Sequence, residues 1–261
     1  MKTETILETR GLTMRFGGLT AVNGFTAAIP AGGIVGLIGP NGAGKTTCFN
    51  MITGFYNPTE GRVFLEGRDI TGSPPHKVCR HGIARTFQNI RLFGNGTVLE
   101  NVKVGCYLRQ RTGWMQAVAC LPGHFREEGE VEQKSLELLD VVGLRRLADE
   151  KASGLPYGAQ RRLEIARALA TEPRFLLLDE PAAGMNPQET QALMAFIRNI
   201  RERFELTILL IEHDMKVVMG ICEHIWVLDY GVTIAEGTPE AIRSNPKVIE
   251  AYLGEEAVSH A

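Results

Sequence analysis

The sequence predicts an α/β fold in which a parallel sheet is interrupted by an inserted helical segment. Two short apolar runs with a helical segment between them form a strand–helix–strand unit, and the short links imply parallel pairing. A third apolar run leads directly into a glycine-rich loop. Between about residues 97 and 155 the periodicity is helical, and no strand pattern occurs.

Three apolar runs are predicted to be buried strands. The run from Ile34 to Ile38 is short, apolar and partly β-branched. The runs FLLLDE and LTILLIEH have the continuous apolar character of strands in a parallel sheet. The opening segment, ILETRGLTMRF, is also strand-like and is punctuated by glycine.

Helices are predicted between and after these strands. In NPQETQALMAFIRNIRERF, Asn186 is a suitable N-cap and Pro187 suits the first turn. The predicted buried stripe of this helix consists of Leu193, Ile197, Ile200 and Phe204. The segment GTPEAIRSNPKVIEAYLG predicts two short helices, with prolines after Thr238 and after Asn245, and we expect them to pack on the core.

The composition argues against several classes of protein. The chain has 261 residues, of which 44% are apolar and 22% charged, as in an ordinary packed protein. The formal net charge is -2 and no long basic run occurs, so no nucleic-acid partner is expected. No apolar run approaches the roughly 20 residues of a membrane span, and the N-terminus lacks a signal-peptide core. We therefore expect any membrane role to come through partners.

The five cysteines form no CxxC pair and no metal-binding spacing, which predicts free thiols in a reducing compartment. They are Cys48, Cys79, Cys106, Cys120 and Cys222. Cys48 lies close behind the glycine-rich loop at a predicted helix start, where the pKa of a thiol can be lowered. A buried, apolar role is the simpler interpretation of this residue.

The glycine-rich loop, GPNGAGKT, matches the pattern G-x-x-x-x-G-K-[ST] between a predicted strand and a predicted helix. Its glycines let backbone N–H groups converge on phosphate oxygens. Lys45 supplies a positive charge to the phosphates, and Thr46 offers a hydroxyl to Mg²⁺. The predicted nucleotide-binding residues here are Gly39, Pro40, Asn41, Gly42, Ala43, Gly44, Lys45, Thr46 and Thr47.

Two adjacent carboxylates end the predicted strand FLLLDE. Carboxyl ends of parallel strands are where α/β proteins bind ligands. Asp179 is suited to hold Mg²⁺, and Glu180 is suited to polarise the attacking water. A helix-capping acid pair is the alternative interpretation, and the upstream phosphate loop favours the catalytic one.

Two further polar residues are candidates for the same site. His213, in IEHDM, follows the next parallel strand, so we expect it at the same sheet edge as Asp179, where it can donate to a phosphate oxygen. Gln88, in RTFQNIRLF, lies where the sheet region gives way to the helical part and can reach Mg²⁺ or water. From the residues alone, a solvated loop glutamine is the simpler interpretation of Gln88.

The stretch GLPYGAQRRLEIARALA combines an unusual helix start with a regular helix. Leu163, Ala166, Leu169 and Ala170 recur at helical spacing. If the start of this helix faces a phosphate, its N–H groups and dipole are the binding tools. Pro156, however, supplies neither an N–H nor a hydroxyl.

Taken in this order, the motifs resemble those of the ATP-binding subunits of ABC transporters, over nearly the whole chain. GPNGAGKT is similar to the Walker A motif and FLLLDE to Walker B, with Glu180 at the position of the catalytic glutamate. Gln88 is similar to the Q-loop glutamine and His213 to the switch histidine. AAGMNP, with Ala183, Gly184 and Asn186, resembles the D-loop, and Phe16 matches the aromatic residue that stacks on adenine.

The resemblance also implies roles for the unusual helix start. LPYGA stands where ABC proteins usually carry the signature LSGGQ, which faces the ATP of a partner subunit. Pro156 replaces the serine, Tyr157 the first glycine and Ala159 the glutamine, so that only Leu155 and Gly158 match. We expect the nucleotide site that uses this chain's LPYGA to be the weaker of two.

The resemblance is closest to one branch, the LivG-type ATPase of branched-chain amino acid importers. It implies ATP and Mg²⁺ as cofactors. It implies Lys45, Gln88, Glu180 and His213 as catalytic residues, and Thr46, Gln88 and Asp179 as metal ligands. The implied partners are two transmembrane permease subunits, a periplasmic or extracellular substrate-binding protein, and a second ATPase in a heterodimer, with a homodimer as the alternative. The implied location is peripheral, on the cytoplasmic face of the inner (cell) membrane.

The implied architecture is a P-loop NTPase (RecA-like) core with an N-terminal antiparallel β subdomain and an inserted ABC α-helical subdomain. We assign residues 1–96 and 156–237 to the core, 97–155 to the helical insertion and 238–261 to a C-terminal extension. Three alternatives stay open: an ABC ATPase for lipid or glycan export, a non-transport ABC ATPase, and a regulatory module without ATPase activity.

Overall fold

The computed structural model of this chain describes residues 4–109 and 122–259. The chain forms two compact units. The first unit combines Met1–Arg85 with Arg174–Ala261, and the second unit is Thr86–Pro173. The predicted boundaries of the helical insertion, 97 and 155, lie within the second unit.

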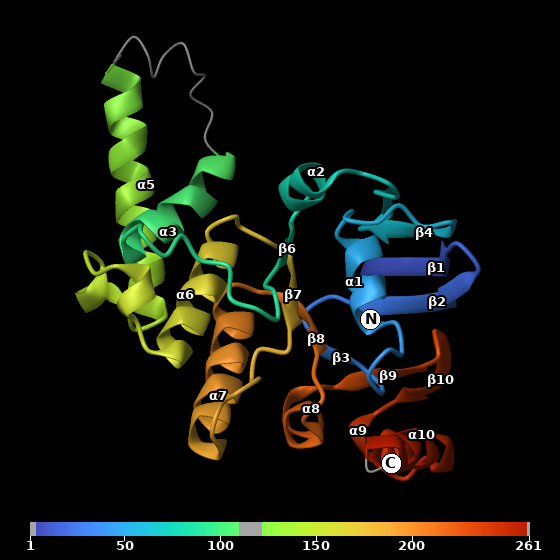
Figure 1. The fold of residues 1–261 in the computed structure, drawn as a ribbon. Helices are drawn as coiled ribbons and strands as arrows, with labels where there is room; N and C mark the ends of the chain where they lie inside the picture. Colours follow the sequence, from blue (N-terminus) through green and yellow to red (C-terminus); the bar gives the residue numbers. More distant parts are fainter. Residues whose placement is uncertain (1–3, 110–121, 260–261) are drawn as a thin grey trace. The chain divides into compact units, whose positions relative to one another are not determined.

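A six-stranded sheet is the framework of the first unit, with the strand order β10-β9-β3-β8-β7-β6 (Figure 1). All neighbouring strands are parallel except β9 and β10, which pair antiparallel. The three strands predicted from apolar runs are completely buried. The strands are β3 (Ile34–Ile38), β6 (Ile83–Arg85), β7 (Phe175–Asp179), β8 (Thr207–Ile211), β9 (His224–Asp229) and β10 (Val232–Gly237).

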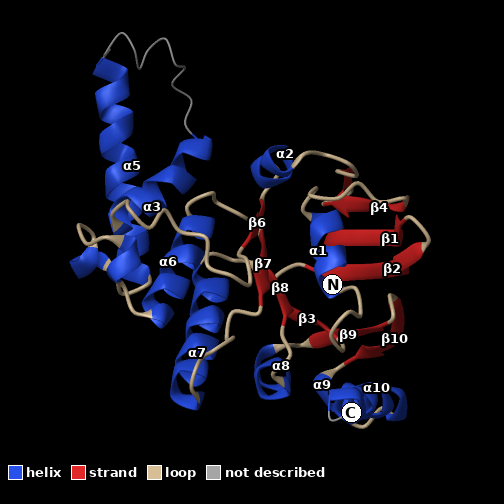
Figure 2. Ribbon diagram, in the orientation of Figure 1, coloured by secondary structure: helices blue, strands red, loops and turns tan. Residues whose placement is uncertain are grey.

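The N-terminal part of the first unit is a second, antiparallel sheet with the order β2-β1-β4-β5, drawn as red arrows in Figure 2. The expected antiparallel subdomain is therefore confirmed. Its strands are β1 (Thr5–Phe16), β2 (Leu19–Pro30), β4 (Glu60–Leu65) and β5 (Arg68–Asp69).

Six helices accompany the sheets among the described residues of the first unit. They are α1 (Lys45–Ile52), α2 (Pro75–Arg80), α7 (Pro187–Arg203), α8 (Met215–Ile221), α9 (Pro239–Arg243) and α10 (Pro246–Ser259). Asn186 caps α7 as predicted, in a capping box with Glu189. The prediction for Phe204 is wrong: it is the C-cap of α7 and is only partly buried, because the helix ends before it.

One hydrophobic core joins the two sheets of the first unit through α1. Phe49 and Ile52 of α1 are buried among Leu37 of β3, Leu209 of β8 and Leu12 of β1. The core therefore fixes the start of α1 against the ends of the parallel strands, and this contact positions the loop between β3 and α1.

Helices and loops make up the described residues of the second unit, with an isolated bridge between Thr97 and Lys151 in place of a sheet. Its helices are α3 (Val98–Cys106), η1 (Tyr107–Arg109), α5 (Pro122–Val141), η2 (Arg145–Leu147), η3 (Ala152–Gly154) and α6 (Tyr157–Leu169). Gly105 of α3 lies so close to α6 that a Cβ would stand 2.5 Å from the carbonyl oxygen of Arg167.

The described part of the chain contains no helix that is long and apolar enough to cross a membrane. Four cysteines are free thiols, and Cys120 lies outside the described residues. Cys48 is buried, and burial raises the pKa of its thiol, which favours the apolar interpretation of this residue.

Candidate active site

The loop between β3 and α1 surrounds the ammonium group of Lys45. The Nζ atom donates to the carbonyl oxygens of Gly39 and Pro40, at 2.6 and 2.7 Å, and the side chain is buried. In this position a single positive charge lies inside a ring of backbone, at the N-terminus of a helix. Such an arrangement favours the binding of an anion.

Two glycines of the loop are required by the backbone. Gly39 has a φ of 147° and Gly44 a φ of 100°, values that other residues rarely adopt. A Cβ would stand 2.0 Å from the carbonyl oxygen of Leu228 at the first position and 2.5 Å from that of Ala21 at the second. The loop is therefore a close-packed cradle, and its shape fits a polyphosphate chain.

Thr46 and Thr47 follow Lys45 in the first turn of α1. Thr46 is exposed and Thr47 is partly buried. The hydroxyl of Thr46 and the carboxylate of Asp179 are both hard oxygen donors of the kind that Mg²⁺ prefers. The described residues contain no cluster of three or more histidine, cysteine or carboxylate side chains suited to a metal ion.

The two predicted carboxylates lie in different surroundings at the end of β7. Asp179 is buried and accepts a hydrogen bond from Arg85 at 2.7 Å. Glu180 is partly buried, and its N–H donates to the carbonyl of Ile211 at 2.9 Å. Its φ of 45° is unusual for a residue other than glycine, as in many functional sites. The two acids are therefore suited to different roles.

Arg85, the last residue of β6, was not predicted from the sequence. Its guanidinium bridges three groups: Nη1 donates to Asn50 Oδ1 at 2.6 Å and to Thr53 Oγ1 at 3.5 Å, and Nη2 donates to Asp179. It also lies 5.4 Å from the ring centroid of Phe49. Arg85 thus connects the carboxylate of β7 to α1, the helix that begins with Lys45.

His213 follows β8 and lies at the expected sheet edge. Asp179 is the register partner of Ile211, and the next residues on both strands leave the sheet on the same side. The Nδ1 atom of His213 is 3.6 Å from Glu180 Oε2. The ring is exposed, so that it can meet a ligand at this edge.

Glu212 is a second residue that the sequence did not reveal. Its side chain is buried, its Oε1 accepts from the Ala182 N–H at 2.8 Å, and its Oε2 accepts from the His213 N–H at 3.3 Å. Burial raises the pKa of this carboxyl, and the N–H donors lower it less strongly. One carboxylate therefore holds the backbone of both the AAGMNP stretch and His213.

The AAGMNP stretch forms a turn between Glu180 and α7. The N–H of Ala183 donates to the carbonyl of Glu180 at 3.2 Å. Gly184 has a φ of 75°, and Asn186 is occupied as the cap of α7. The local structure of this stretch is thus explained by turn and cap formation.

Phe16 lies at the end of β1 and is exposed. It makes an edge-to-face contact with Tyr56, with ring centroids 5.4 Å apart and planes at 77°. The residues between α1 and β4 therefore supply a second aromatic ring that the sequence analysis had not identified. An exposed aromatic face at this place is suited to stacking.

The remaining predicted residues belong to the second unit. Helix α6 begins at Tyr157 with Pro156 as its N-cap, and no side-chain hydrogen bond caps it. The N–H groups of Ala159 and Gln160 donate to the Pro156 carbonyl, and Gln160 Nε2 donates to the carbonyl of the buried Leu155. Gly158 lies in the first turn, and Gln88 in a loop before α3.

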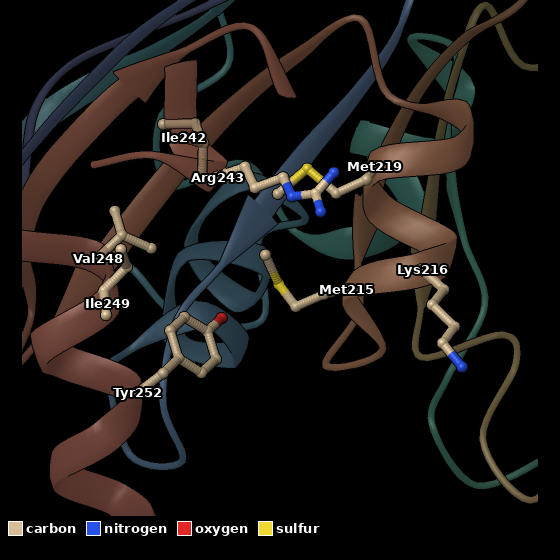
Figure 3. A pocket seen from close by; sticks show the side chains of 8 residues that line it. All are labelled: Met215, Lys216, Met219, Ile242, Arg243, Val248, Ile249 and Tyr252. Atoms are coloured by element: carbon tan, nitrogen blue, oxygen red, sulfur yellow. The ribbon is translucent and has the colours of Figure 1, made fainter. Parts of the chain in front are cut away.

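A cavity of about 600 Å³ lies away from the phosphate loop, between α8 and the two C-terminal helices. Figure 3 shows Met215 of α8 pointing toward Tyr252 of α10, and Met219 of α8 beside Arg243 of α9. Helix α8 begins just after His213. The C-terminal helices therefore pack beside an element that is directly connected to the candidate site.

Comparison with known proteins places the chain in a family. The sequence model of the ABC transporter family matches residues 22–183, and that of the branched-chain amino acid ATP-binding cassette transporter matches residues 232–258. The chain is 52% identical over 250 residues to the high-affinity branched-chain amino acid transport ATP-binding protein BraF of Pseudomonas aeruginosa, covering 96% of this chain and 98% of the relative. It is 49% identical over 252 residues to LivG of Escherichia coli K12, covering 97% and 99%.

The fold agrees with that comparison. The crystal structure of the ADP conformation of MJ1267, an ATP-binding cassette of an ABC transporter, superimposes with a TM-score of 0.84 at 34% sequence identity. The superposition covers 96% of this chain and 99% of the other. This chain therefore belongs to the ABC transporter family, among the ATP-binding ATPase subunits of the branched-chain amino acid branch.

Proposed function

We propose that the chain hydrolyses ATP with Glu180 as the general base. The observation that carries this proposal is the meeting of Glu180 and His213 at the edge of the sheet where the phosphate loop also begins. Glu180 is placed to accept a proton from the attacking water. His213 is placed to donate to a phosphate oxygen and thereby to respond to its loss.

The phosphate loop holds the substrate. Lys45 moves from the carbonyls of Gly39 and Pro40 to the phosphates, while the loop N–H groups bind the same oxygens. Phe16, with Tyr56 beside it, stacks on the adenine ring. These contacts position ATP and stabilise the charge that develops during transfer.

Thr46 and Asp179 are the proposed ligands of Mg²⁺, with Gln88 as a third from the second unit. When bound, this ion neutralises the charge of the β- and γ-phosphates. The role of the protein is to hold oxygen donors at that place. Arg85 holds the carboxylate of Asp179 in a fixed orientation.

Two nucleotide sites form between this chain and a second ATPase subunit. One site uses Lys45 and Glu180 of this chain, and the other uses its LPYGA stretch. Because Pro156 offers no hydroxyl to a phosphate, the second site is the weaker one. Replacing Pro156 by serine is expected to raise the ATPase activity of the assembled pair. Unchanged activity would argue against this asymmetry.

The cargo is proposed to be branched-chain amino acids. The proposal is supported by the near-complete coverage of BraF and LivG and by the match of the C-terminal residues to the branched-chain amino acid family. The expected partners are two permease subunits, a second ATPase and an external binding protein. The chain then works as a peripheral subunit on the cytoplasmic face of the membrane.

Co-purification tests the cargo and the partners. The chain, tagged at its N-terminus, is isolated from solubilised membranes of its native cell with and without ATP, as wild type and as Glu180→Gln. Recovery of two permeases, a second ATPase and an amino-acid-binding protein supports the proposal. Recovery of lipid-export proteins or of ribosomes overturns the cargo and leaves the ATP chemistry standing.

The hydrolysis step has its own test. In the assembled transporter, Glu180→Gln is expected to lower the ATPase rate by about 10²–10⁴-fold, the usual contribution of a general base. Binding of a fluorescent ATP analogue remains, because the phosphate loop is unchanged. Retention of the full rate in this variant would remove Glu180 from the proposed role.

A further inference from the structure

One buried guanidinium in the second unit contacts two of the motif stretches. Arg161 of α6 is fully buried. Its Nη1 atom donates to the carbonyl oxygen of Phe87 at 2.7 Å, and its Nη2 atom donates to that of Gln88 at 2.8 Å. The backbone position of Gln88 is therefore set directly by a side chain of the helix that begins in the LPYGA stretch.

Glu164 completes this contact from the same helix. Its Oε2 atom accepts from Arg161 Nη1 at 2.8 Å, and both side chains are buried. Its Oε1 atom lies 3.3 Å from the N–H of Arg91 and 3.4 Å from that of Phe87, and accepts from both. Arg161, the positive partner of the ion pair, thus binds backbone carbonyls of the 87–91 segment. Glu164, the negative partner, binds backbone N–H groups of the same segment.

Tyr157 connects the pair to the start of α6. Its hydroxyl accepts from Arg161 Nη2 at 3.2 Å, on the same nitrogen that donates to the Gln88 carbonyl. The guanidinium carbon lies 5.9 Å from the centre of the tyrosine ring. A residue four positions along a helix is the natural neighbour of such a side chain. A glycine at position 157 would have no side chain to make this contact.

The energetics of the ion pair favour a geometric role. A buried ion pair adds little net stability compared with apolar residues, whereas removal of one partner is costly. Because the acceptors are backbone carbonyls, the 87–91 segment cannot shift against α6 without breaking several charge-assisted hydrogen bonds at once. The two segments therefore move together or remake their contacts together.

We propose that Tyr157, Arg161 and Glu164 form a relay that couples the position of Gln88 to the start of α6. Arg161 is its central positioning residue. The inference rests on the proposed function, in which Gln88 serves one nucleotide site and LPYGA serves the other. A conformational change at either nucleotide site is then transmitted to the other site through the guanidinium of Arg161, and the coupling is reciprocal.

Amide hydrogen exchange of the full chain tests the relay without reference to cargo. The readout is the exchange of peptides that cover residues 87–91, measured in Glu180→Gln with and without MgATP. Tyr157→Phe removes the hydroxyl and keeps the ring. We expect about fivefold faster exchange in this segment, the change that corresponds to one lost hydrogen bond.

Tyr107→Phe is the matched control in the same unit. Tyr107 is 40% exposed and Tyr157 is 44% exposed, and the Tyr107 hydroxyl donates to Glu128 rather than to a motif stretch. We expect no change at 87–91 in this variant. Equal exchange in the two variants, or faster exchange over the whole chain in Tyr157→Phe, overturns the relay.

A functional readout separates coupling from folding. In the assembled transporter, Arg161→Lys keeps the charge but loses the planar fork that reaches both carbonyls. We expect the stimulation of ATPase activity by the substrate-loaded binding protein to fall severalfold more than the unstimulated rate. A proportional fall of both rates contradicts the relay. If no amino-acid permease assembles with the chain, the proposed cargo fails and the exchange result still decides the relay.

Discussion

The guanidinium of Arg85 donates to the carboxylate of Asp179 at 2.7 Å, and only 6% of each side chain is exposed. This ion pair joins β6 to the end of β7, next to the candidate active site. Replacing Arg85 by methionine removes the partner of a buried charge. We expect the free energy of unfolding to fall by about 3–5 kcal/mol, measured by urea denaturation at neutral pH.

An exposed ion pair in the same unit is the control for this experiment. Arg62 donates to Asp69 at 3.2 Å, but 68% and 39% of these side chains are exposed. Water already solvates both charges, so Arg62→Met is expected to cost less than about 1 kcal/mol. Similar losses in the two variants would mean that burial does not determine the strength of the Arg85 contact.

The glycine-rich loop and the adjacent carboxylates could be located from the sequence because each is a local pattern. GPNGAGKT occupies eight consecutive positions, and in FLLLDE the two acids stand at the end of β7, Asp179 as its last residue and Glu180 directly after it. The parallel order of β7 and β8 was enough to bring His213 to the same edge. The positions that carry these motifs were therefore readable without the structure.

Local sequence patterns do not predict the contacts of Arg85, Glu212 and the Arg161–Glu164 pair. Arg85 is 94 residues away from Asp179, and only the pairing of β6 with β7 brings them together. Arg161 and Glu164 have the spacing of an ordinary exposed pair on a helix. They are buried because the 87–91 segment covers them, and periodicity does not reveal which loop covers a helix.

Glu212 is expected to make stability depend on pH. Burial raises the pKa of its carboxyl above the ordinary value of 4.5, so the folded protein holds this proton more tightly than the unfolded chain. Stabilisation by the protonated carboxyl is complete below the unfolded pKa and is lost as the pH rises through the folded pKa. Glu212→Gln has no proton to lose. Its stability relative to wild type should therefore increase from pH 4.5 upward, as measured by urea denaturation.

Glu240 provides a control of opposite sign. Hydrogen bonds from its own backbone N–H and from Thr238 lower the pKa of this exposed carboxyl. Its stabilising effect is present above the unfolded pKa and is lost as the pH falls. The stability of Glu240→Gln relative to wild type should thus decrease as the pH rises. Parallel slopes for Glu212→Gln and Glu240→Gln would contradict the assignment for Glu212.

Alanine variants at Gly44 and Gly42 distinguish two reasons for glycine in the phosphate loop: a positive φ, and a lack of space for a Cβ. Both have positive φ values, 100° and 78°, so alanine is strained at either position. At Gly44 the new Cβ would also stand 2.5 Å from the Ala21 carbonyl oxygen, whereas nothing lies within 4 Å at Gly42. We expect Gly44→Ala to cost about 1–3 kcal/mol more than Gly42→Ala, measured by urea unfolding without nucleotide. Equal losses would show that backbone strain alone selects glycine here.

Ile242 tests whether the C-terminal helices are part of the core. Its side chain is 1% exposed, whereas Ile249, which lines the same cavity, is 47% exposed. Truncation of a buried isoleucine to alanine typically costs about 2–5 kcal/mol, and exposed positions lose less than about 1 kcal/mol. We therefore expect Ile242→Ala to lower the free energy of unfolding by about 2–5 kcal/mol, and Ile249→Ala to lower it by less than about 1 kcal/mol.

The same two variants distinguish packing from regulation. Ile242 lines the same cavity as Met215, which is the first residue of the helix that follows His213. If the C-terminal helices only complete the core, Ile242→Ala retains the wild-type rate of ATP hydrolysis at temperatures well below its Tm. A change in rate there, with Ile249→Ala unaffected, would show that packing under α8 is transmitted to His213. The stability loss and the hydrolysis rate therefore have to be measured on the same preparation. A loss of stability without a change in hydrolysis rate identifies α9 as a structural element.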